Sequence, residues 1–248
     1  MPAPASTRMG EFRDELTGFM STFLGYGSLS ASTWFIGPEE GGGQSVEELE
    51  KRIAVWQALG KRPTVDLCEF HIRLGVTKYF ASRPTIQRTW GQLVRVHLAA
   101  SGKATNTRVV RTYQAERLGR ADGDSLLGEL LPLPKSSLRA WPYAPLASSI
   151  ACLRTQEAYR DELQPQRIEL WQNMLTRYRP ETVVFYGTNQ KALWESIAGV
   201  RFDTRHGDFN TGSNDWTQFM LLKHPNARKG VDNSYFITAG SYLAELLR

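Results

Sequence analysis

The chain has 248 residues, of which 41% are hydrophobic and 11% aromatic, and it carries a formal net charge of +5. This length and composition suffice for one substantial core, so we expect a single domain over residues 1–248, with residues 1–10 disordered. The sequence has no run of about 18 apolar residues and no apolar signal-peptide segment, so we expect a soluble, cytoplasmic protein without a membrane partner. The charge permits a polyanionic partner without requiring one.

Neither cysteine nor histidine spacing indicates a metal centre. Cys68 and Cys152 are far apart and form no CxxC or Cys/His pattern, so we expect reduced thiols and neither a disulfide framework nor a zinc site. His71 and His97 fall within mixed or helical segments and are expected as packing or surface residues rather than ligands. We therefore expect no metal and no cofactor.

Apolar residues recur at spacings of three and four in several segments, the pattern of amphipathic helices. Ser45 and Glu48 have the spacing of a capping box at the start of one segment, and Pro165 begins another. The helices that this pattern predicts cover residues 11–24, 45–60, 86–97, 165–178 and 188–198, with a last helix within residues 235–246.

Short apolar runs predict buried strands at residues 34–36, 125–131, 182–186 and 216–222. Pro132, Pro134 and Pro142 follow the second run, and because proline cannot donate a backbone hydrogen bond, we expect the strand to stop there. Gly187 closes the third strand before a helix, which is typical of parallel sheets. The alternation predicts an α/β domain with a mainly parallel, four-stranded sheet.

Residues 101–120 form the most basic and polar region, with Arg108, Arg111, Arg117 and Arg120 around Tyr113. Two interpretations stay open for it: a solvated connection, or a surface that contacts phosphate groups. Residues 61–83 and 201–215 are mixed or polar and show no clear period, so no element is predicted there.

The first strand runs directly into two carboxylates, Glu39 and Glu40, followed by three glycines. We interpret this stretch as an active-site loop, because glycine lets the backbone approach a ligand closely. The alternative is a tight turn with solvated acids before a helix.

Glu129 is a lone acid inside the second apolar run. Burying an unpaired charge costs several kcal/mol, so this residue should face a site or be paired, with Lys135 as one candidate partner. Ligands of open parallel sheets bind beyond the carboxyl ends of the strands. We therefore expect Glu39, Glu40, Glu129, Lys135 and His224 to meet at one edge of the sheet.

The motifs WFIGPEEGGG, ELLPLP, VVFYGTNQKAL and LLKHPN accompany the strands in this order. In order and context they resemble the uracil-DNA glycosylase superfamily, over residues 30–247. The resemblance implies a three-layer α/β/α sandwich that hydrolyses the N-glycosidic bond of a flipped-out nucleotide without a metal. The implied partner is DNA, and we expect a monomer without an obligate protein partner.

The resemblance also implies roles for individual residues. Glu39, or Glu40 if the register differs by one, would hold the attacking water and stabilise the positive charge that develops on the sugar. His224 would donate a hydrogen bond to a carbonyl oxygen of the departing base, although it could also be a surface histidine. The base would lie against Gly37, Pro38, Gly41, Glu129 and Asn226, and the DNA against Lys135, Ser136, Thr188, Asn189, Arg228 and Lys229.

Three departures from the family pattern bear on the substrate. Glu129 stands where uracil-specific members have asparagine, and a carboxylate accepts from the exocyclic amine of cytosine but cannot serve both edges of uracil. Gly41 replaces the tyrosine that blocks substituents at the pyrimidine 5-position. Arg228, with its neighbours Ala227 and Lys229, replaces the apolar wedge that follows the histidine motif.

These departures favour a glycosylase for cytosine with a bulky 5-substituent, such as the hydroxymethylated or glucosylated cytosines of some bacteriophages, and hence a role in defence. A conventional uracil or mismatch glycosylase is the alternative within the same family. A catalytically silent nucleic-acid-binding or nucleotide-binding module is the alternative from another class.

Overall fold

The fold is organised around an eight-stranded sheet with the order β3-β1-β4-β2-β5-β8-β7-β6. A computed structural model describes residues 5–137, 139–205 and 209–248. The strands are β1 (Gly25–Gly27), β2 (Thr33–Gly41), β3 (Thr64–Val65), β4 (Ser125–Lys135), β5 (Thr182–Tyr186), β6 (Asp203–Arg205), β7 (Phe209–Ser213) and β8 (Gln218–Leu222).

Helices connect most of these strands. The α-helices are α1 (Ala5–Thr22), α2 (Val46–Ala58), α3 (Leu67–Arg73), α4 (Arg88–Ala100), α5 (Thr107–Glu116), α6 (Gln156–Tyr178), α7 (Lys191–Ala198) and α8 (Asn233–Leu246). Three short 3-10 helices are η1 (Ala144–Ser148), η2 (Ala151–Arg154) and η3 (Thr188–Gln190).

The four predicted strands form the parallel centre of the sheet. β2 pairs in parallel with β4 and β5, and β5 pairs in parallel with β8. The α/β class is therefore confirmed, but the predicted number of four strands is wrong, because the sheet has eight. β1 and β3 extend the sheet beyond β4, and β7 and β6 extend it antiparallel beyond β8. These added strands have two to five residues, too few to show an apolar period.

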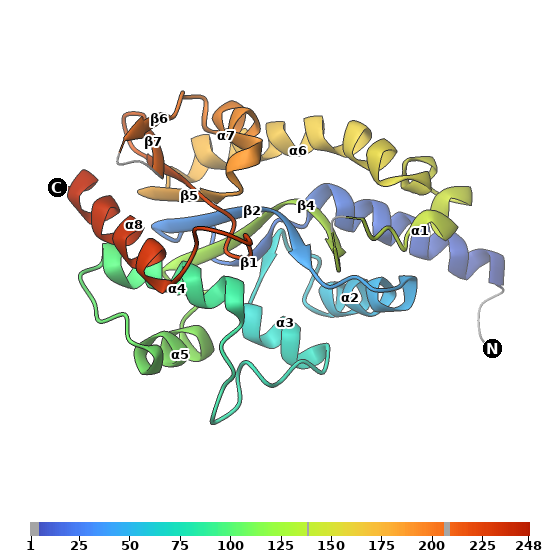
Figure 1. The fold of residues 1–248 in the computed structure, drawn as a ribbon. Helices are drawn as coiled ribbons and strands as arrows, with labels where there is room; N and C mark the ends of the chain where they lie inside the picture. Colours follow the sequence, from blue (N-terminus) through green and yellow to red (C-terminus); the bar gives the residue numbers. More distant parts are fainter. Residues whose placement is uncertain (1–4, 138, 206–208) are drawn as a thin grey trace.

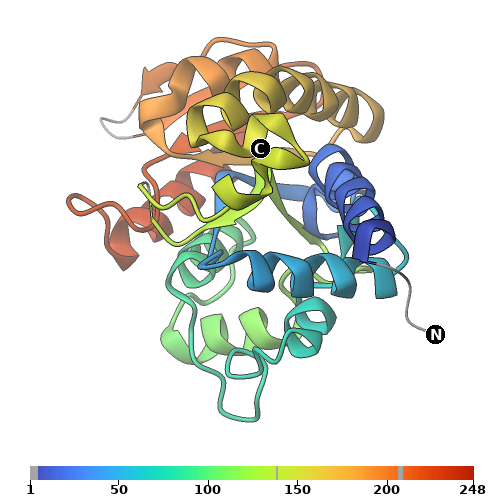
Figure 2. The same cartoon turned by 90° about the vertical axis from the view of Figure 1, so that its right-hand side faces the viewer.

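Helices cover both faces of the sheet. Figures 1 and 2 show α6 and α7 on one side and α2, α3, α4, α5 and α8 on the other. One contiguous cluster of buried apolar side chains joins the layers, with Trp34, Phe185 and Phe219 of the central strands among its fully buried members. Among the described residues, no helix is both long enough and apolar enough to cross a membrane.

Two strands run further than their sequences suggested. β2 continues through the expected loop to Gly41, with a register irregularity between Glu39 and Gly41. β4 continues to Lys135 and includes Pro132 and Pro134, so the expected stop after Leu131 is wrong. Beyond residue 128, β4 pairs with a strand on its β2 side alone, and proline is tolerated along such an edge.

Several helix boundaries differ from those expected. α2 has the expected N-cap, because the Ser45 side chain accepts from the backbone N–H of Glu48. α6 begins at Gln156 and contains Pro165, so the expected proline-led start is wrong. α1 begins at Ala5, so the expected disorder does not extend over residues 5–10. α3 and α5 lie in segments where no helix was expected, which excludes an irregular connection over Thr107–Glu116.

Candidate active site

The carboxyl ends of β2, β4, β5 and β8 meet at one edge of the sheet. Glu39, near the end of β2, lies there with a side chain that is 10% exposed. Nζ of Lys135 lies 2.7 Å from its Oε1, and Nη2 of Arg160 on α6 lies 3.5 Å from the same oxygen. Two cations therefore flank the Glu39 carboxyl at the mouth of the sheet.

Glu40 turns towards other partners, as expected for successive residues of a strand. Its Oε2 accepts a hydrogen bond from the Tyr26 hydroxyl at 2.7 Å and from Nη1 of Arg52 at 2.8 Å. Nε2 of His71 lies 3.5 Å from its Oε1. Burial alone would raise the pKa of Glu40, but Arg52, His71 and Tyr26 outweigh it and lower this pKa to about 2.

Glu129 lies on β4 directly beside Gly37 of β2 and is 8% exposed. Burial raises the pKa of its carboxyl well above the ordinary value, and the charges of Glu40 and Glu39 raise it further. The Tyr186 hydroxyl donates a hydrogen bond to this carboxyl, which opposes the shift. Oε2 of Glu129 has no hydrogen-bond partner among the residues that the structure describes. These surroundings favour the neutral acid.

The backbone of Glu129 is held from behind by α6. Its carbonyl oxygen accepts from Nη2 of Arg167 at 2.9 Å and from Nε1 of Trp171 at 3.3 Å. Nε of Arg167 also donates to the carbonyl of Leu130 at 2.7 Å. These bonds satisfy the edge of β4 where no strand pairs with it, and they fix the position from which the Glu129 side chain projects.

Tyr186, the last residue of β5, connects the polar groups of the site. A Cβ added to Gly37 would lie 2.1 Å from the Tyr186 hydroxyl oxygen, so only glycine leaves room for this ring. The ring centroids of Tyr186 and His224 lie 5.4 Å apart. Glu129 and His224 therefore both contact the same tyrosine.

His224 follows β8 and is half-buried. Its Nδ1 accepts the backbone N–H of Asn226 at 3.1 Å, which assigns the proton of the neutral ring to Nε2. Burial lowers the pKa of His224 and favours this neutral form. Nε2–H is thus a donor at the edge where the four parallel strands end.

The remaining predicted residues lie in different surroundings. Lys135 is buried against Glu39, which contradicts a direct contact with the DNA backbone. The Asn226 side chain donates to the Thr89 hydroxyl at 3.1 Å, so it points to α4 rather than to Glu129. Those that are exposed and follow the ends of the parallel strands are Ser136, Thr188, Asn189, Arg228 and Lys229. Pro38 is half-buried and Gly41 is exposed on β2.

Sequence reasoning missed several groups of this site, namely Tyr26, Arg52, Arg160 and Tyr186. Arg52 offered a signal, because it falls on the apolar face of α2 beside Ile53, where an arginine requires a buried partner. His71 was expected as a packing residue and does pack against aromatic rings, but it also contacts Glu40. His97 lies elsewhere, with Nε2 3.4 Å from Oδ2 of Asp124.

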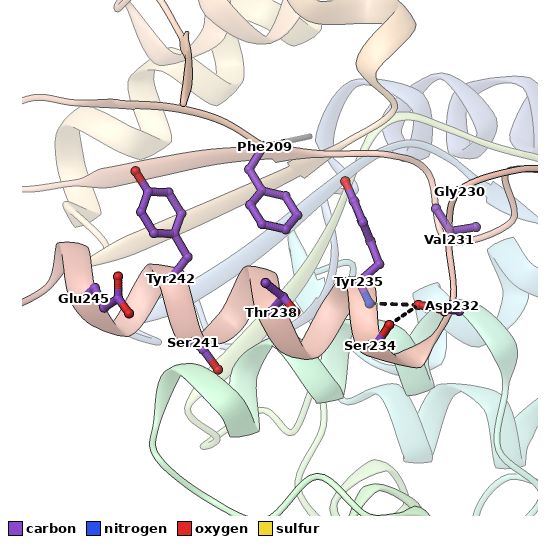
Figure 3. A pocket seen from close by; sticks show the side chains of 10 residues that line it. All are labelled: Phe209, Gly230, Val231, Asp232, Ser234, Tyr235, Thr238, Ser241, Tyr242 and Glu245. Carbon is purple, nitrogen blue, oxygen red and sulfur yellow. Dashed lines mark hydrogen bonds between the residues drawn. The ribbon is translucent and has the colours of Figure 1, made fainter. Parts of the chain in front are cut away.

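A groove lies outside this cluster. It has a volume of about 660 Å³ and runs along α8, between Phe209, Tyr235 and Tyr242 (Figure 3). Asp232 at one end caps α8 by accepting the backbone N–H of Tyr235. The candidate site is nevertheless the edge of the parallel strands, because perturbed pKa values gather there. The pKa of Glu40 is lowered, that of Glu129 is raised, and His224 is held in its neutral form.

Within the described part of the chain, no three His, Cys, Asp or Glu side chains gather closely enough to hold a metal ion. Comparison with known proteins adds no family assignment. No protein-family model matches the chain, and no curated protein matches it.

Proposed function

We propose that this protein is a DNA glycosylase that hydrolyses the N-glycosidic bond of a flipped-out base and leaves an abasic site. The proposed substrate is a 5-modified cytosine, hydroxymethylated or glucosylated, of phage DNA, and the proposed role is defence in the cytoplasm. The observation that carries the proposal is the meeting of Glu39, Glu129 and His224 at the carboxyl edge of a parallel sheet, linked by Tyr186.

Each group suits one part of this reaction. The ionised carboxylate of Glu39 orients the attacking water and stabilises the positive charge that develops at C1′. Nε2–H of His224 donates to O2 of the base, where negative charge collects as the bond breaks. Glu129 hydrogen-bonds the Watson–Crick edge of the base. No step requires a metal or an organic cofactor.

The choice of base rests on Glu129 and Gly41. A carboxyl group at position 129 can accept a hydrogen bond from the exocyclic amine of cytosine. A Cβ added to Gly41 would meet no described atom within 4 Å, and the backbone there does not have the positive φ that favours glycine. Space beside Gly41 is therefore available to a substituent on the base.

The decisive measurement is release of base from oligonucleotides that differ at one position: uracil, cytosine, 5-hydroxymethylcytosine or its glucosylated form. We expect alkali-labile sites to form fastest with the modified cytosines. Gly41→Tyr should lower the rate on the glucosylated base by at least about 10-fold, since a steric loss of 1.4 kcal/mol has that effect, and spare uracil and cytosine. Gly10→Tyr on α1 is the matched control, because a Cβ there also meets nothing.

Other outcomes separate the alternatives. Fastest release of uracil would refute the modified-cytosine proposal and support a conventional uracil glycosylase. DNA retained on a filter without any alkali-labile site would indicate a silent binding module.

A further inference from the structure

The carboxyl of Glu129 lies in surroundings that on balance disfavour its negative charge. The charged and titratable groups that act on it are Glu39 and Glu40 of β2, Tyr186 of β5 and Arg167 of α6. Burial and the two neighbouring carboxylates raise its pKa, and the hydrogen bond from Tyr186 and the charge of Arg167 do not reverse this. In a site that works near neutral pH, a carboxyl held as the acid can donate a proton.

The hydrogen bonds of Glu129 also indicate where this proton lies. One carboxyl oxygen accepts from the Tyr186 hydroxyl, while Oε2 has no partner within the described chain and is fully buried. In the neutral acid, the oxygen that accepts from Tyr186 is best assigned as the carbonyl oxygen, and the proton then lies on Oε2. A buried polar atom without a partner destabilises the folded protein, and a ligand atom that completes the hydrogen bond would remove this cost.

The edge of cytosine complements this arrangement. Its N3 is an acceptor that fits Oε2–H, and its exocyclic amine is a donor that fits the carbonyl oxygen. Uracil carries hydrogen on N3, so it would oppose a donor to the Oε2–H group. The neutral acid therefore discriminates between the two bases more strictly than a carboxylate, which could accept from N3–H of uracil.

Resting on the function proposed above, we propose that Glu129 is the general acid that protonates N3 of the flipped cytosine as the glycosidic bond breaks. The C1′–N1 bond breaks with its electron pair going to the base, and the Oε2 proton moves to N3. Cytosine leaves as a neutral molecule. Water adds its oxygen to C1′ and releases a proton to Glu39 or solvent, and Glu129 regains a proton from solvent before the next turnover.

Release of cytosine needs a general acid more than release of uracil does. The cytosine anion is a poorer leaving group than the uracil anion, because it has one carbonyl group fewer over which to spread the charge. His224 supplies a hydrogen bond to O2 but does not neutralise the base. Proton transfer to N3 removes the charge itself, and a positioned acid contributes about 10²–10⁴-fold in rate.

Glu129→Gln tests this step sharply, because glutamine has the shape of the neutral acid. Its amide N–H can donate to N3 and its carbonyl can accept from the amine, but it cannot transfer a proton. We expect single-turnover release of 5-hydroxymethylcytosine to fall by about 100-fold or more, with filter binding of the same DNA unchanged. Glu129→Asp keeps a proton donor and should retain more activity than Glu129→Gln at equal folded fraction, measured by thermal melting.

Two further readouts distinguish proton transfer from recognition. The wild-type rate should fall as the pH rises through the raised pKa of Glu129, and this limb of the pH profile should be absent in Glu129→Gln. A substrate whose base is a 3-deazacytosine has no N3 to protonate, so wild type and Glu129→Gln should process it equally slowly. A Glu129→Gln variant as active as wild type would overturn the general-acid role and leave the glycosylase proposal intact. A wild-type protein that releases no base from any substrate would refute both.

Discussion

Glu39 and Glu40 are adjacent, yet they hold their charges against different partners. Glu39 pairs with Lys135 and Arg160 at the end of the sheet, while Glu40 lies inside a network of Tyr26, Arg52 and His71. Glu40 has its acceptor positions filled by side chains that also support the fold. Glu39 is therefore the better candidate for orienting water, and Glu40 is better suited to a structural role.

Glu39→Gln should reduce base release by about 100-fold or more, because the charge that it removes stabilises the transition state. DNA binding should change little. Lys135→Met is the matched control, because it breaks the same ion pair and leaves the carboxylate in place. Equal loss of activity in both variants would show that the ion pair, rather than the carboxylate, is what matters. Full activity of Glu39→Gln would contradict the assignment of Glu39.

The network around Glu40 predicts a dependence of stability on pH. The folded protein lowers the pKa of Glu40 from 4.5 to about 2, so its contribution to the free energy of unfolding is complete above pH 4.5 and is lost as the pH falls towards 2. The shift corresponds to about 3 kcal/mol. Urea unfolding of wild type and Glu40→Gln should therefore differ at pH 7 and converge near pH 2.

Glu129 should give the opposite dependence of stability on pH. Its pKa is raised on folding, so the stability that it contributes is present below its ordinary pKa and is lost as the pH rises through the raised value. The wild-type protein should therefore lose stability relative to Glu129→Gln as the pH rises from 4.5 through the raised pKa of Glu129. A difference between wild type and Glu40→Gln that stays constant from pH 7 to pH 2 would refute the assignment of Glu40.

At the scale of elements, β4 shows why part of the fold could not be predicted. Proline excludes a strand only where the lost hydrogen bond matters, and the edge of β4 beyond β1 makes its bonds to side chains instead. The Tyr159 hydroxyl accepts the backbone N–H of Leu133, and the Tyr143 hydroxyl donates to the carbonyl of Pro134. Nothing in the local sequence indicates that tyrosines of later segments supply these bonds.

Elements with strong local signals were predicted well. α2 has its cap and its apolar face within one short segment, and each of the four central strands contains a short apolar run. β1 and β3 have too few residues to carry a pattern, and α6 starts after an N-cap at Thr155 rather than at Pro165. Local physics therefore specifies the centre of the sheet, and tertiary contacts specify its edges.

The candidate site follows the same division. Glu39, Glu129 and His224 could be predicted to meet, because each lies at or near the carboxyl end of a parallel strand. Their partners could not, since Arg160, Arg167 and Tyr186 come from segments that the chain brings together only in the folded state. The protonation state of Glu129 depends on those partners, and so it also required the structure.

At the scale of the whole molecule, the question is where a protein of net charge +5 would contact DNA. Arg228 and Lys229 are exposed on the loop that carries His224, beside the carboxyl edge. Arg108 and Arg111 are exposed on α5, which leads to the amino end of β4 and lies away from that loop in Figure 1. Both pairs could contact phosphate by charge alone, but only the first lies next to the candidate site.

The double change Arg228→Ala and Lys229→Ala should weaken DNA binding for all bases alike, because phosphate contacts carry no base information. Each lost contact should reduce the slope of log K against log salt by about 0.9 for duplex DNA. Arg108→Ala with Arg111→Ala removes the same charge from α5 and should leave both affinity and slope nearly unchanged. Binding measured by fluorescence anisotropy from 50 to 200 mM salt, a range over which such contacts are strongly salt-dependent, resolves the two pairs.

Equal effects would show that DNA contacts extend over α5, as one interpretation of residues 101–120 allows. A larger effect of the α5 pair would place the DNA over α5 and contradict the site at the carboxyl edge.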